Sequence, residues 1–229
     1  MDNYNEKEVS LAKRIFITAT NTNIGKTYSS LILLEAFSRL GLRVGAYKPI
    51  ETGVRAYPLD GKLLYDKALS LNPDLHSLSI DDIVTLQFPL PAAPFIANQA
   101  KAIDLAQFDR ALEKIETLCD IVIIEGAGGL MVPIDKQTMM IDLPKHFNAV
   151  TLLITHCTLG CINDTLLSLQ ALEKKELPFV WALNCKSEES EFAITSLPYF
   201  EHAFHTIYNV SQDSDRLAKA LLDTISPTL

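Results

Sequence analysis

The stretch FITATNTNIGKTYSS, residues 16–30, constrains the fold of this chain more than any other segment. The β-branched and aromatic run RIFITA predicts a strand, and GKTYSSLILLEAFSRLG repeats its apolar residues at helical spacing. Gly25, Lys26 and Thr27 therefore stand where a loop leaves a strand and enters a helix. In that context, the ending Gly-Lys-Thr is typical of a phosphate-binding loop.

The loop departs from the commonest phosphate-binding form at its front. The pattern G-x-x-x-x-G-K-[ST] places Gly where this chain has Thr20, and two asparagines flank the next threonine, Thr22. Successive backbone N–H groups can still point at an anion, and the helix dipole adds to the attraction. We expect Lys26 to reach the outer phosphates of a nucleotide and the Thr27 hydroxyl to bind Mg²⁺. A plain helix start that carries a lysine is the weaker alternative.

Short apolar runs alternate with amphipathic stretches along the rest of the chain. RVGAYKP (closed by Pro49), DIVIIEGAGG, AVTLLIT, PFVWALN and HTIYNV are predicted strands. DLAQFDRALEKIETL, with Asp104 as its N-cap, and INDTLLSLQALEKKE are predicted helices. This alternation predicts a mainly parallel sheet with helices on both faces. The least periodic part, residues 58–99, contains FPLPAAP, which we expect to be a loop framing a site. No repeat or linker divides the sequence, so we expect one domain over residues 1–229, with residues 1–13 as a polar lead-in.

Size, charge and cysteine content exclude several classes of protein. The chain has 229 residues, 48% of them hydrophobic and 21% charged, which is ordinary for a globular domain. A net charge of −8 argues against nucleic acid as a partner but allows small anionic substrates. The four cysteines follow no paired framework, which fits a reducing compartment. Neither a run of about 18 apolar residues nor a signal-peptide core is present, so we expect the cytoplasm and no membrane partner.

Two further strand ends are expected to face the same crevice as the loop. The strand DIVII ends at Glu125 and a cluster of glycines, and the carboxyl edge of a parallel sheet faces the ligand. Lys48 ends the strand RVGAYK, and a second positive charge beside Lys26 suits an anionic reaction centre. A glycine turn after a buried strand and a solvated strand-end lysine are the alternative interpretations.

Two other stretches place polar groups at helix starts. YDKALSL has Asp66 near the start of a helix, where a cap or surface acid is the alternative interpretation. HCTLGCINDT has one histidine and two cysteines, but no second pair stands at zinc-finger spacing. We interpret it as a strand end, a turn at Gly160 and a helix whose first amides and Asn163 can hold a carboxylate.

Taken together, these stretches resemble the dethiobiotin synthetase family over residues 15–184. TATNTNIGKT is similar to the family's loop T-G-T-D-T-x-V-G-K-T, KPIETG to K-P-x-x-[ST]-G, and IEGAGGL to V-E-G-A-G-G-x. LGCIN matches L-G-x-I-N, and YDKALSL echoes the helix start S-D-A-x-x-L with Asp66 in the acid position. Ala19, Asn21 and Asn23 replace the loop's usual Gly, Asp and Glu. The residues after Asn184 differ from the family's base-reading pair, so the base preference stays open.

The resemblance implies a three-layer P-loop NTPase fold and an ATP-dependent ring closure in biotin synthesis. In that reaction 7,8-diaminopelargonic acid takes up CO₂ as a carbamate on one amine. The γ-phosphoryl group of ATP passes to the carbamate and gives a carbamic–phosphoric anhydride. The second amine then closes the ureido ring and releases phosphate. Mg²⁺ is the implied cofactor, and a homodimer with composite active sites is the implied assembly.

The resemblance also implies roles for individual residues. Catalysis is expected of Lys26, Lys48 and Thr22, and Mg²⁺ binding of Thr27, Asp66 and Glu125. The residues expected to bind the nucleotide are Asn23, Ile24, Gly25, Lys26, Thr27, Tyr28, Glu125 and Asn184. The residues expected to bind the diamine are Thr22, Lys48, Thr52, Gly128, Gly129, Leu130 and, from the partner subunit, Gly160, Cys161 and Asn163.

Three other functions stay open. A regulatory ATPase of the partitioning type shares the fold, but its loop typically has an early second lysine that residues 19–24 lack. A small-molecule P-loop kinase would usually carry an arginine-rich lid, and this chain has no arginine cluster of that kind. A paralogue that binds nucleotide without turnover also fits the sequence.

Overall fold

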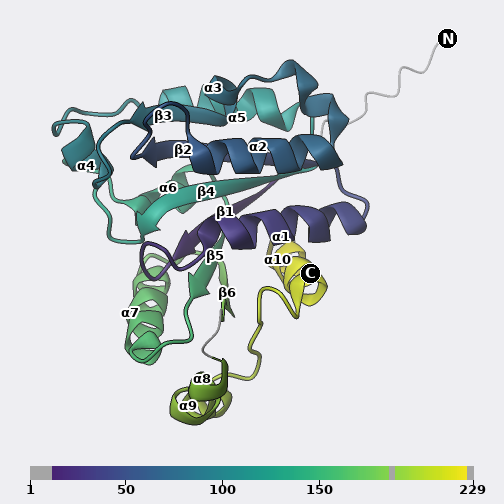
Figure 1. The fold of residues 1–229 in the computed structure, drawn as a ribbon, viewed down its shortest axis with the longest axis vertical. Coiled ribbons are helices and arrows are strands. Elements are labelled where there is room, and N and C mark those ends of the chain that lie inside the picture. The colour runs from purple at the N-terminus through teal and green to yellow at the C-terminus, as the bar shows by residue number, and fades with distance from the viewer. Residues whose placement is uncertain (1–11, 186–188, 226–229) are drawn as a thin grey trace.

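A sheet of six parallel strands runs through the part of the chain that this computed structural model describes, residues 12–185 and 189–225 (Figure 1). The strand order is β3-β2-β4-β1-β5-β6, and neighbouring strands pair in parallel. The strands are β1 (Lys13–Ala19), β2 (Val44–Thr52), β3 (Val84–Phe88), β4 (Ile121–Gly129), β5 (Val150–Thr155) and β6 (Phe179–Leu183).

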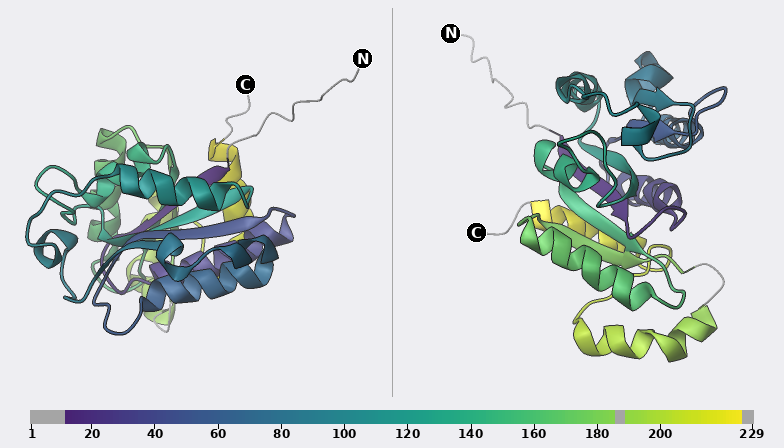
Figure 2. Two further views of the ribbon diagram at one scale, coloured as in Figure 1. Left: turned by 90° about the horizontal axis from the view of Figure 1, so that it is seen from above. Right: turned by 90° about the vertical axis from the view of Figure 1, so that its left-hand side faces the viewer.

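Helices cover both faces of this sheet (Figures 1 and 2). The α-helices are α1 (Lys26–Arg39), α2 (Leu59–Leu71), α3 (Ile80–Ile83), α4 (Pro94–Ala97), α5 (Ala106–Glu116), α6 (Leu143–His146), α7 (Cys161–Lys174), α8 (Glu189–Thr195), α9 (Leu197–Ala203) and α10 (Ser214–Ile225). The 3₁₀ helices of the described residues are η1 (Pro73–Ser77) and η2 (Met140–Asp142). Helices α1, α2 and α10 share one core with the sheet, whereas α5, α6 and α7 pack on the opposite face. The predicted three-layer α/β fold is confirmed.

Successive residues of the buried strands supply the two cores in turn. Ile15 and Ile17 of β1 pack on the side of α1, whereas Phe16 between them belongs to the opposite core with Phe147. Strand β5 is buried along its whole length. This two-sided burial is the reason that the strands read as unbroken apolar runs in the sequence.

The end of β2 differs from the prediction. The strand does not close at Pro49 but continues to Thr52. Its pairing with β4 ends at Tyr47, while its pairing with β3 runs on to Thr52. Proline cannot donate a ladder hydrogen bond, and it is tolerated here because the pairing with β4 has already ended.

The prediction of a strand at HTIYNV is also wrong. Only an isolated bridge joins Asn209 to Leu183 of β6, with Leu183 N–H donating to the Tyr208 carbonyl. The segment turns away at once, because Asn209 N–H donates to the Asp213 carboxylate and the Asn209 side chain accepts from Ser211. The segment therefore has the amino-acid composition of a strand, but it does not form the ladder of backbone hydrogen bonds that defines one.

Other boundaries are close to the prediction. Helix α5 starts at Ala106, and Asp104 accepts a hydrogen bond from the Ala106 amide although Leu105 is the N-cap. Residues 58–99 hold α2 and β3 as well as the expected loop, FPLPAAP. Residues 1–11 of the predicted lead-in lie outside the described residues, and Lys13 already belongs to β1.

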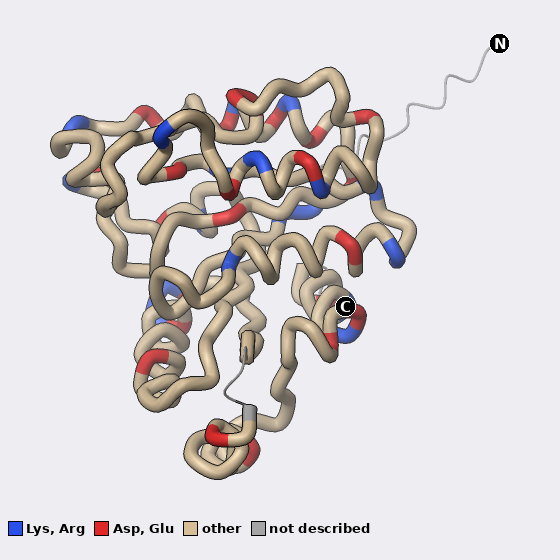
Figure 3. The backbone as a smooth tube through the Cα atoms, in the orientation of Figure 1, with Lys and Arg blue, Asp and Glu red and all other residues tan. Residues whose placement is uncertain are grey.

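The charged residues do not gather into one basic surface in the view of Figure 3, where Lys and Arg positions are interspersed with Asp and Glu along the described chain. Among the described residues, no helix is long and apolar enough to cross a bilayer.

Candidate active site

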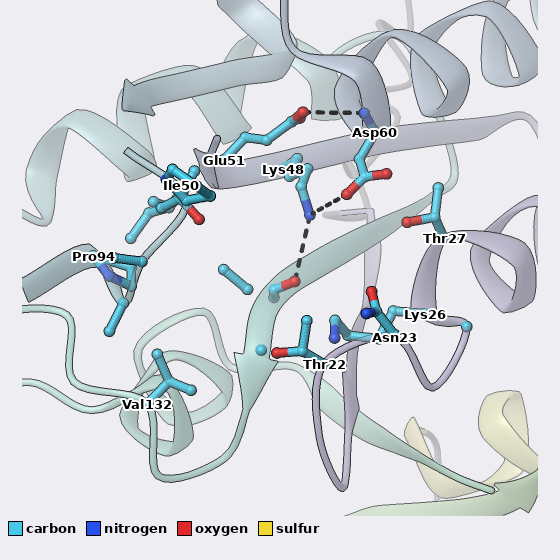
Figure 4. Close-up of a pocket in the computed structure, with 18 residues that line it drawn as sticks. Thr22, Asn23, Lys26, Thr27, Lys48, Ile50, Glu51, Asp60, Pro94 and Val132 are labelled. Atoms are coloured by element: carbon cyan, nitrogen blue, oxygen red, sulfur yellow. Dashed lines mark hydrogen bonds and ion pairs between the residues drawn. The ribbon is translucent and has the colours of Figure 1, made fainter. Parts of the chain in front are cut away.

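A cavity of about 680 Å³ lies at the carboxyl ends of β2 and β4, beside the loop that follows β1 (Figure 4). The start of α2 and the proline-rich segment before α4 complete its walls, so FPLPAAP does frame this cavity. The predicted site residues that line it are Thr22, Asn23, Gly25, Lys26, Thr27, Lys48, Thr52 and Gly128. The predicted site residues outside its lining are Ile24, Tyr28, Asp66, Glu125, Gly129, Leu130, Gly160, Cys161, Asn163 and Asn184.

A buried ion pair stands at the inner wall of the cavity. Lys48 Nζ donates to Glu125 Oε1 at 2.7 Å, and the two side chains are only 3% and 1% exposed. Burial by itself would lower the pKa of Lys48, but the carboxylates of Glu125, Asp60 and Glu51 raise it above its ordinary value. Lys48 therefore stays charged while it faces the cavity.

The same carboxylate holds the start of α1. Thr27 Oγ1 donates to Glu125 Oε1 at 3.0 Å, and Ser30 Oγ donates to Glu125 Oε2 at 2.8 Å. Sequence reasoning missed Ser30, which is fully buried. Its signal was its position three residues after Thr27, because residues at that spacing lie on one face of a helix.

Two glycines, Gly25 and Gly129, allow the loop after β1 to pack closely against its neighbours. Gly25, at φ 102°, is the N-cap of α1, and a Cβ there would lie 2.1 Å from Asn184 Nδ2. Asn184 Nδ2 donates to the Ile24 carbonyl at 2.7 Å, which ties the end of β6 to the loop. Gly129 packs closely on the loop, because a Cβ there would lie 3.2 Å from the Ala19 carbonyl oxygen. The Gly129 position therefore supports the loop rather than lining the cavity.

Lys26 adds a second positive charge at the cavity (Figure 4). Its burial, followed by repulsion from Lys48, lowers its pKa to about 8. Two ammonium groups in one partly desolvated cavity favour an anionic ligand, because a negative charge between them relieves their repulsion.

The predicted position of Asp66 at a helix start is wrong. Helix α2 begins at Leu59, so Asp66 lies within the helix, where both carboxylate oxygens accept from Lys62 Nζ at 2.8 Å. Both partners are about half exposed. Asp60, on the first turn of α2, lines the cavity instead, with Oδ2 3.9 Å from Lys48 Nζ.

The sequence contained the signal for Asp60. In LDGKLL, the acid is followed by the small residue Gly61 and, four positions on, by Leu64, which is the spacing of the family pattern S-D-A-x-x-L. YDKALSL places Ser70 at that last position. The better match was missed because the residue at the N-cap of α2 is Pro58, which is not one of the residue types that mark a helix start in a sequence.

The donor set at the cavity fits Mg²⁺. Among the described residues, no three His, Cys, Asp or Glu side chains group into a protein-only metal site. Mg²⁺ instead usually binds one or two carboxylates, with nucleotide phosphates and water as the remaining ligands. The Thr27 hydroxyl and the Asp60 carboxylate line the cavity, and the buried Glu125 carboxylate lies outside its lining but accepts a hydrogen bond from Thr27 Oγ1. All three groups offer oxygen ligands.

The segment at the start of α7 lies apart from this cavity. Gly160, at φ 98°, is the N-cap of α7, and the exposed Asn163 side chain donates to Asp164. Cys161 is fully buried, and its amide donates to the Thr158 carbonyl.

The cysteines correct another expectation. Cys157 and Cys185 form a disulfide, with Cα atoms 5.0 Å apart, although the sequence showed no paired framework. The two cysteines are far apart along the chain, and only the ends of the neighbouring strands β5 and β6 bring them together. Cys119 and Cys161 are free and buried. This disulfide does not fit the reducing compartment that was expected from the cysteine content.

The chain is similar in sequence to a set of proteins that share one name. Residues 13–211 match the family described as an AAA domain. The chain is 41% identical over 210 residues to the ATP-dependent dethiobiotin synthetase BioD of Sulfurovum sp. (strain NBC37-1), covering 90% of this chain and 99% of that protein. It is 34% identical over 216 residues to the protein of the same name from Wolinella succinogenes, covering 93% and 100% of the two chains.

Solved structures with the same fold are more distant in sequence. A plasmid partition protein from Borrelia burgdorferi has a TM-score of 0.55 at 13% identity, covering 96% of this chain and all of that chain. The MinD cell division protein of Aquifex aeolicus has a TM-score of 0.51 at 16% identity, covering 94% and 96%. At these identities the likeness shows the fold alone. The sequence relatives, aligned along nearly their whole length, decide the family, and the chain belongs to the dethiobiotin synthetases.

Proposed function

We propose that this protein closes the ureido ring of dethiobiotin from 7,8-diaminopelargonic acid, CO₂ and ATP. The observation that carries the proposal is the meeting of two lysines from different elements with a threonine and two acids at one cavity. Lys26 comes from α1, Lys48 from β2 and Asp60 from α2, while Glu125 of β4 joins them from below the surface. This constellation suits a reaction in which a triphosphate must approach a second anion.

Each of the two lysines neutralises a different anion. A carbamate and a triphosphate repel each other, and preorganised positive groups lower the energy of the transition state between them. Lys26, beside the loop amides, serves the nucleotide phosphates. Lys48, held in place by Glu125, serves the carbamate, and Thr22 and Thr52 at the cavity wall position the diamine.

We assign Mg²⁺ to Thr27, Asp60 and Glu125, with Asp60 in the place first expected for Asp66. When bound, the ion neutralises charge on the β- and γ-phosphates. The protein's own contribution is to hold these oxygens at the wall shared by α1, α2 and β4. The cytoplasm, where ATP and the diamine are available, is the proposed location, and the whole chain is proposed to act as one domain.

A switch ATPase of the partitioning type is the second candidate. The fold similarity to the partition and MinD proteins is compatible with it. The loop between β1 and α1 nevertheless contains no lysine before Lys26, and the relatives from Sulfurovum sp. and Wolinella succinogenes carry the synthetase name. A nucleotide-binding paralogue without turnover is the remaining alternative.

Turnover separates these functions. Purified protein supplied with diamine, bicarbonate, Mg²⁺ and ATP should form dethiobiotin, detected by mass, with one phosphate released per product. Leaving out either diamine or bicarbonate should abolish phosphate release, because the carbamate is the phosphoryl acceptor. ATP hydrolysis that proceeds without the diamine and does not respond to it would favour the switch function instead.

The placement of the acids on α2 predicts opposite outcomes for two matched variants. Asp60→Asn should lower kcat/KM roughly 10²-fold or more, because a charged ligand of the ion that stabilises the phosphates is lost. Asp66→Asn should leave kcat/KM within about twofold, since its carboxylate pairs with Lys62 in solvent. Steady-state kinetics at saturating Mg²⁺ measures both. The reverse order of the two effects would restore Asp66 to the site.

We also propose a homodimer whose subunits complete each other's sites. The diamine's carboxylate lies at the far end of an alkyl chain from its amines, so an extended substrate needs a second anchor. Asn163 and the start of α7 lie outside the cavity, which fits an anchor offered to a partner. Leu159, next to Gly160, is 82% exposed, and Leu167 of α7 is 60% exposed. Such apolar exposure suits a protein–protein interface.

Mixing two inactive chains tests the shared site. A Lys26→Ala chain and an Asn163→Ala chain should each be nearly inactive alone. Random exchange leaves one intact composite site in each heterodimer, so the mixture should recover about a quarter of wild-type activity. Native mass spectrometry confirms that exchange has occurred. Exchange without recovery, or full activity of an isolated monomer, rules out composite sites.

A further inference from the structure

Glu51, near the end of β2, has a buried carboxylate whose hydrogen-bond partners are backbone amides. The residue is 6% exposed. Asp60 N–H donates to Glu51 Oε1 at 3.1 Å, and Gly61 N–H donates to Glu51 Oε2 at 2.8 Å. Burial raises the pKa of this carboxyl group, while the two amides and Lys48 act in the opposite direction. A buried acid at this position is costly and calls for a role.

The two amides belong to the first turn of α2. The first N–H groups of a helix have no intrahelical acceptor, and Pro58, the N-cap of α2, makes no side-chain cap hydrogen bond. Glu51 supplies the missing acceptors from the neighbouring strand. Its negative charge also gains from the helix dipole and from charge-assisted hydrogen bonds. The start of α2 is thereby fixed to the end of β2.

Gly61 makes this close approach possible. A Cβ on Gly61 would lie 2.0 Å from Val84 Cγ2 and 3.3 Å from Glu51 Oε2. Any side chain at position 61 would therefore push the first turn of α2 away from β3 and from the carboxylate. A glycine in the first turn of a helix is otherwise unfavourable, so its presence here follows from packing.

Asp60, which precedes Gly61 in this turn, lines the cavity. Its own amide is held by Glu51, and its carboxylate lies at the cavity, 3.9 Å from Lys48 Nζ (Figure 4). The direction of a side chain follows the backbone that carries it. Moving the first turn of α2 would move the Asp60 carboxylate relative to Lys48 and Thr27.

We propose that Glu51 is a positioning residue that holds the first turn of α2 so that Asp60 meets the magnesium–nucleotide complex. The proposal rests on the function proposed above, since it takes Asp60 as a ligand of the ion. Glu51 itself acts only through the backbone of α2. Residues that orient a metal ligand commonly change metal affinity about 10- to 100-fold when they are replaced.

The test measures how much Mg²⁺ is needed to bind a non-hydrolysable ATP analogue, by calorimetry across a Mg²⁺ titration. Glu51→Ala should raise the half-saturating Mg²⁺ concentration about tenfold or more. Glu51→Gln, which keeps the shape and one acceptor oxygen, should recover part of that loss. In dethiobiotin synthesis, both variants should regain much of kcat at high Mg²⁺, whereas Asp60→Asn should not.

The matched control is Asp104→Ala, which removes another carboxylate bonded to the first amide of a helix, at α5 and away from the cavity. It should lower the melting temperature without changing the Mg²⁺ requirement. If both Glu51 variants lower the melting temperature but keep the wild-type Mg²⁺ requirement, Glu51 is a structural cap and the proposal is wrong. If Glu51→Ala does not fold, the isosteric Glu51→Gln decides by the same criterion.

The two proposals fail separately. Wild-type protein that binds the analogue with Mg²⁺ but makes no dethiobiotin would overturn the proposed reaction. A shifted Mg²⁺ requirement in the Glu51 variants of that same protein would still support the positioning role.

Discussion

The buried ion pair between Lys48 and Glu125 is the interaction on which the rest of the site depends. Charges as deeply buried as these lose most of their hydration, and they are tolerated only when they are paired and hydrogen-bonded. Glu125 meets this condition with Lys48 on one oxygen and Ser30 on the other, and Thr27 adds a further hydrogen bond. One carboxylate thus connects β4 to the adjacent strand β2 and to the first turns of α1.

The same pair explains how the cavity keeps its charge. A lysine buried alone would lose its proton, but the acids around Lys48 raise its pKa. Asp60 extends the network to α2, and Glu51 fixes the turn that carries Asp60. The protein's own contacts thus hold the network in place, and groups fixed in this way need little reorganisation when an anion enters. That preorganisation is what a reaction between two anions requires.

Much of this arrangement could be predicted from the sequence, because the informative signals were local. The loop ending in Lys26, the strand ending in Glu125 and the parallel fold each follow from a short segment and its period. Signals that depend on tertiary contacts were lost. Asp60 was missed because its helix is capped from another strand, by Glu51, and the pairing of Cys157 with Cys185 arises only where β5 and β6 end. The segment at Asn209 has a strand's composition, but it lies at the sheet's edge and turns away.

The most direct measurement is a double-mutant cycle on the ion pair, by urea unfolding at one fixed protein concentration. Lys48→Met and Glu125→Gln should each cost about 3–5 kcal/mol of unfolding free energy, because each leaves a buried group without its charged partner. The double variant should cost at least about 1 kcal/mol less than the sum, since it removes both charges together. Single-variant costs that add to within about 0.5 kcal/mol would show that the two charges are not coupled, and the site would have to be organised by other contacts.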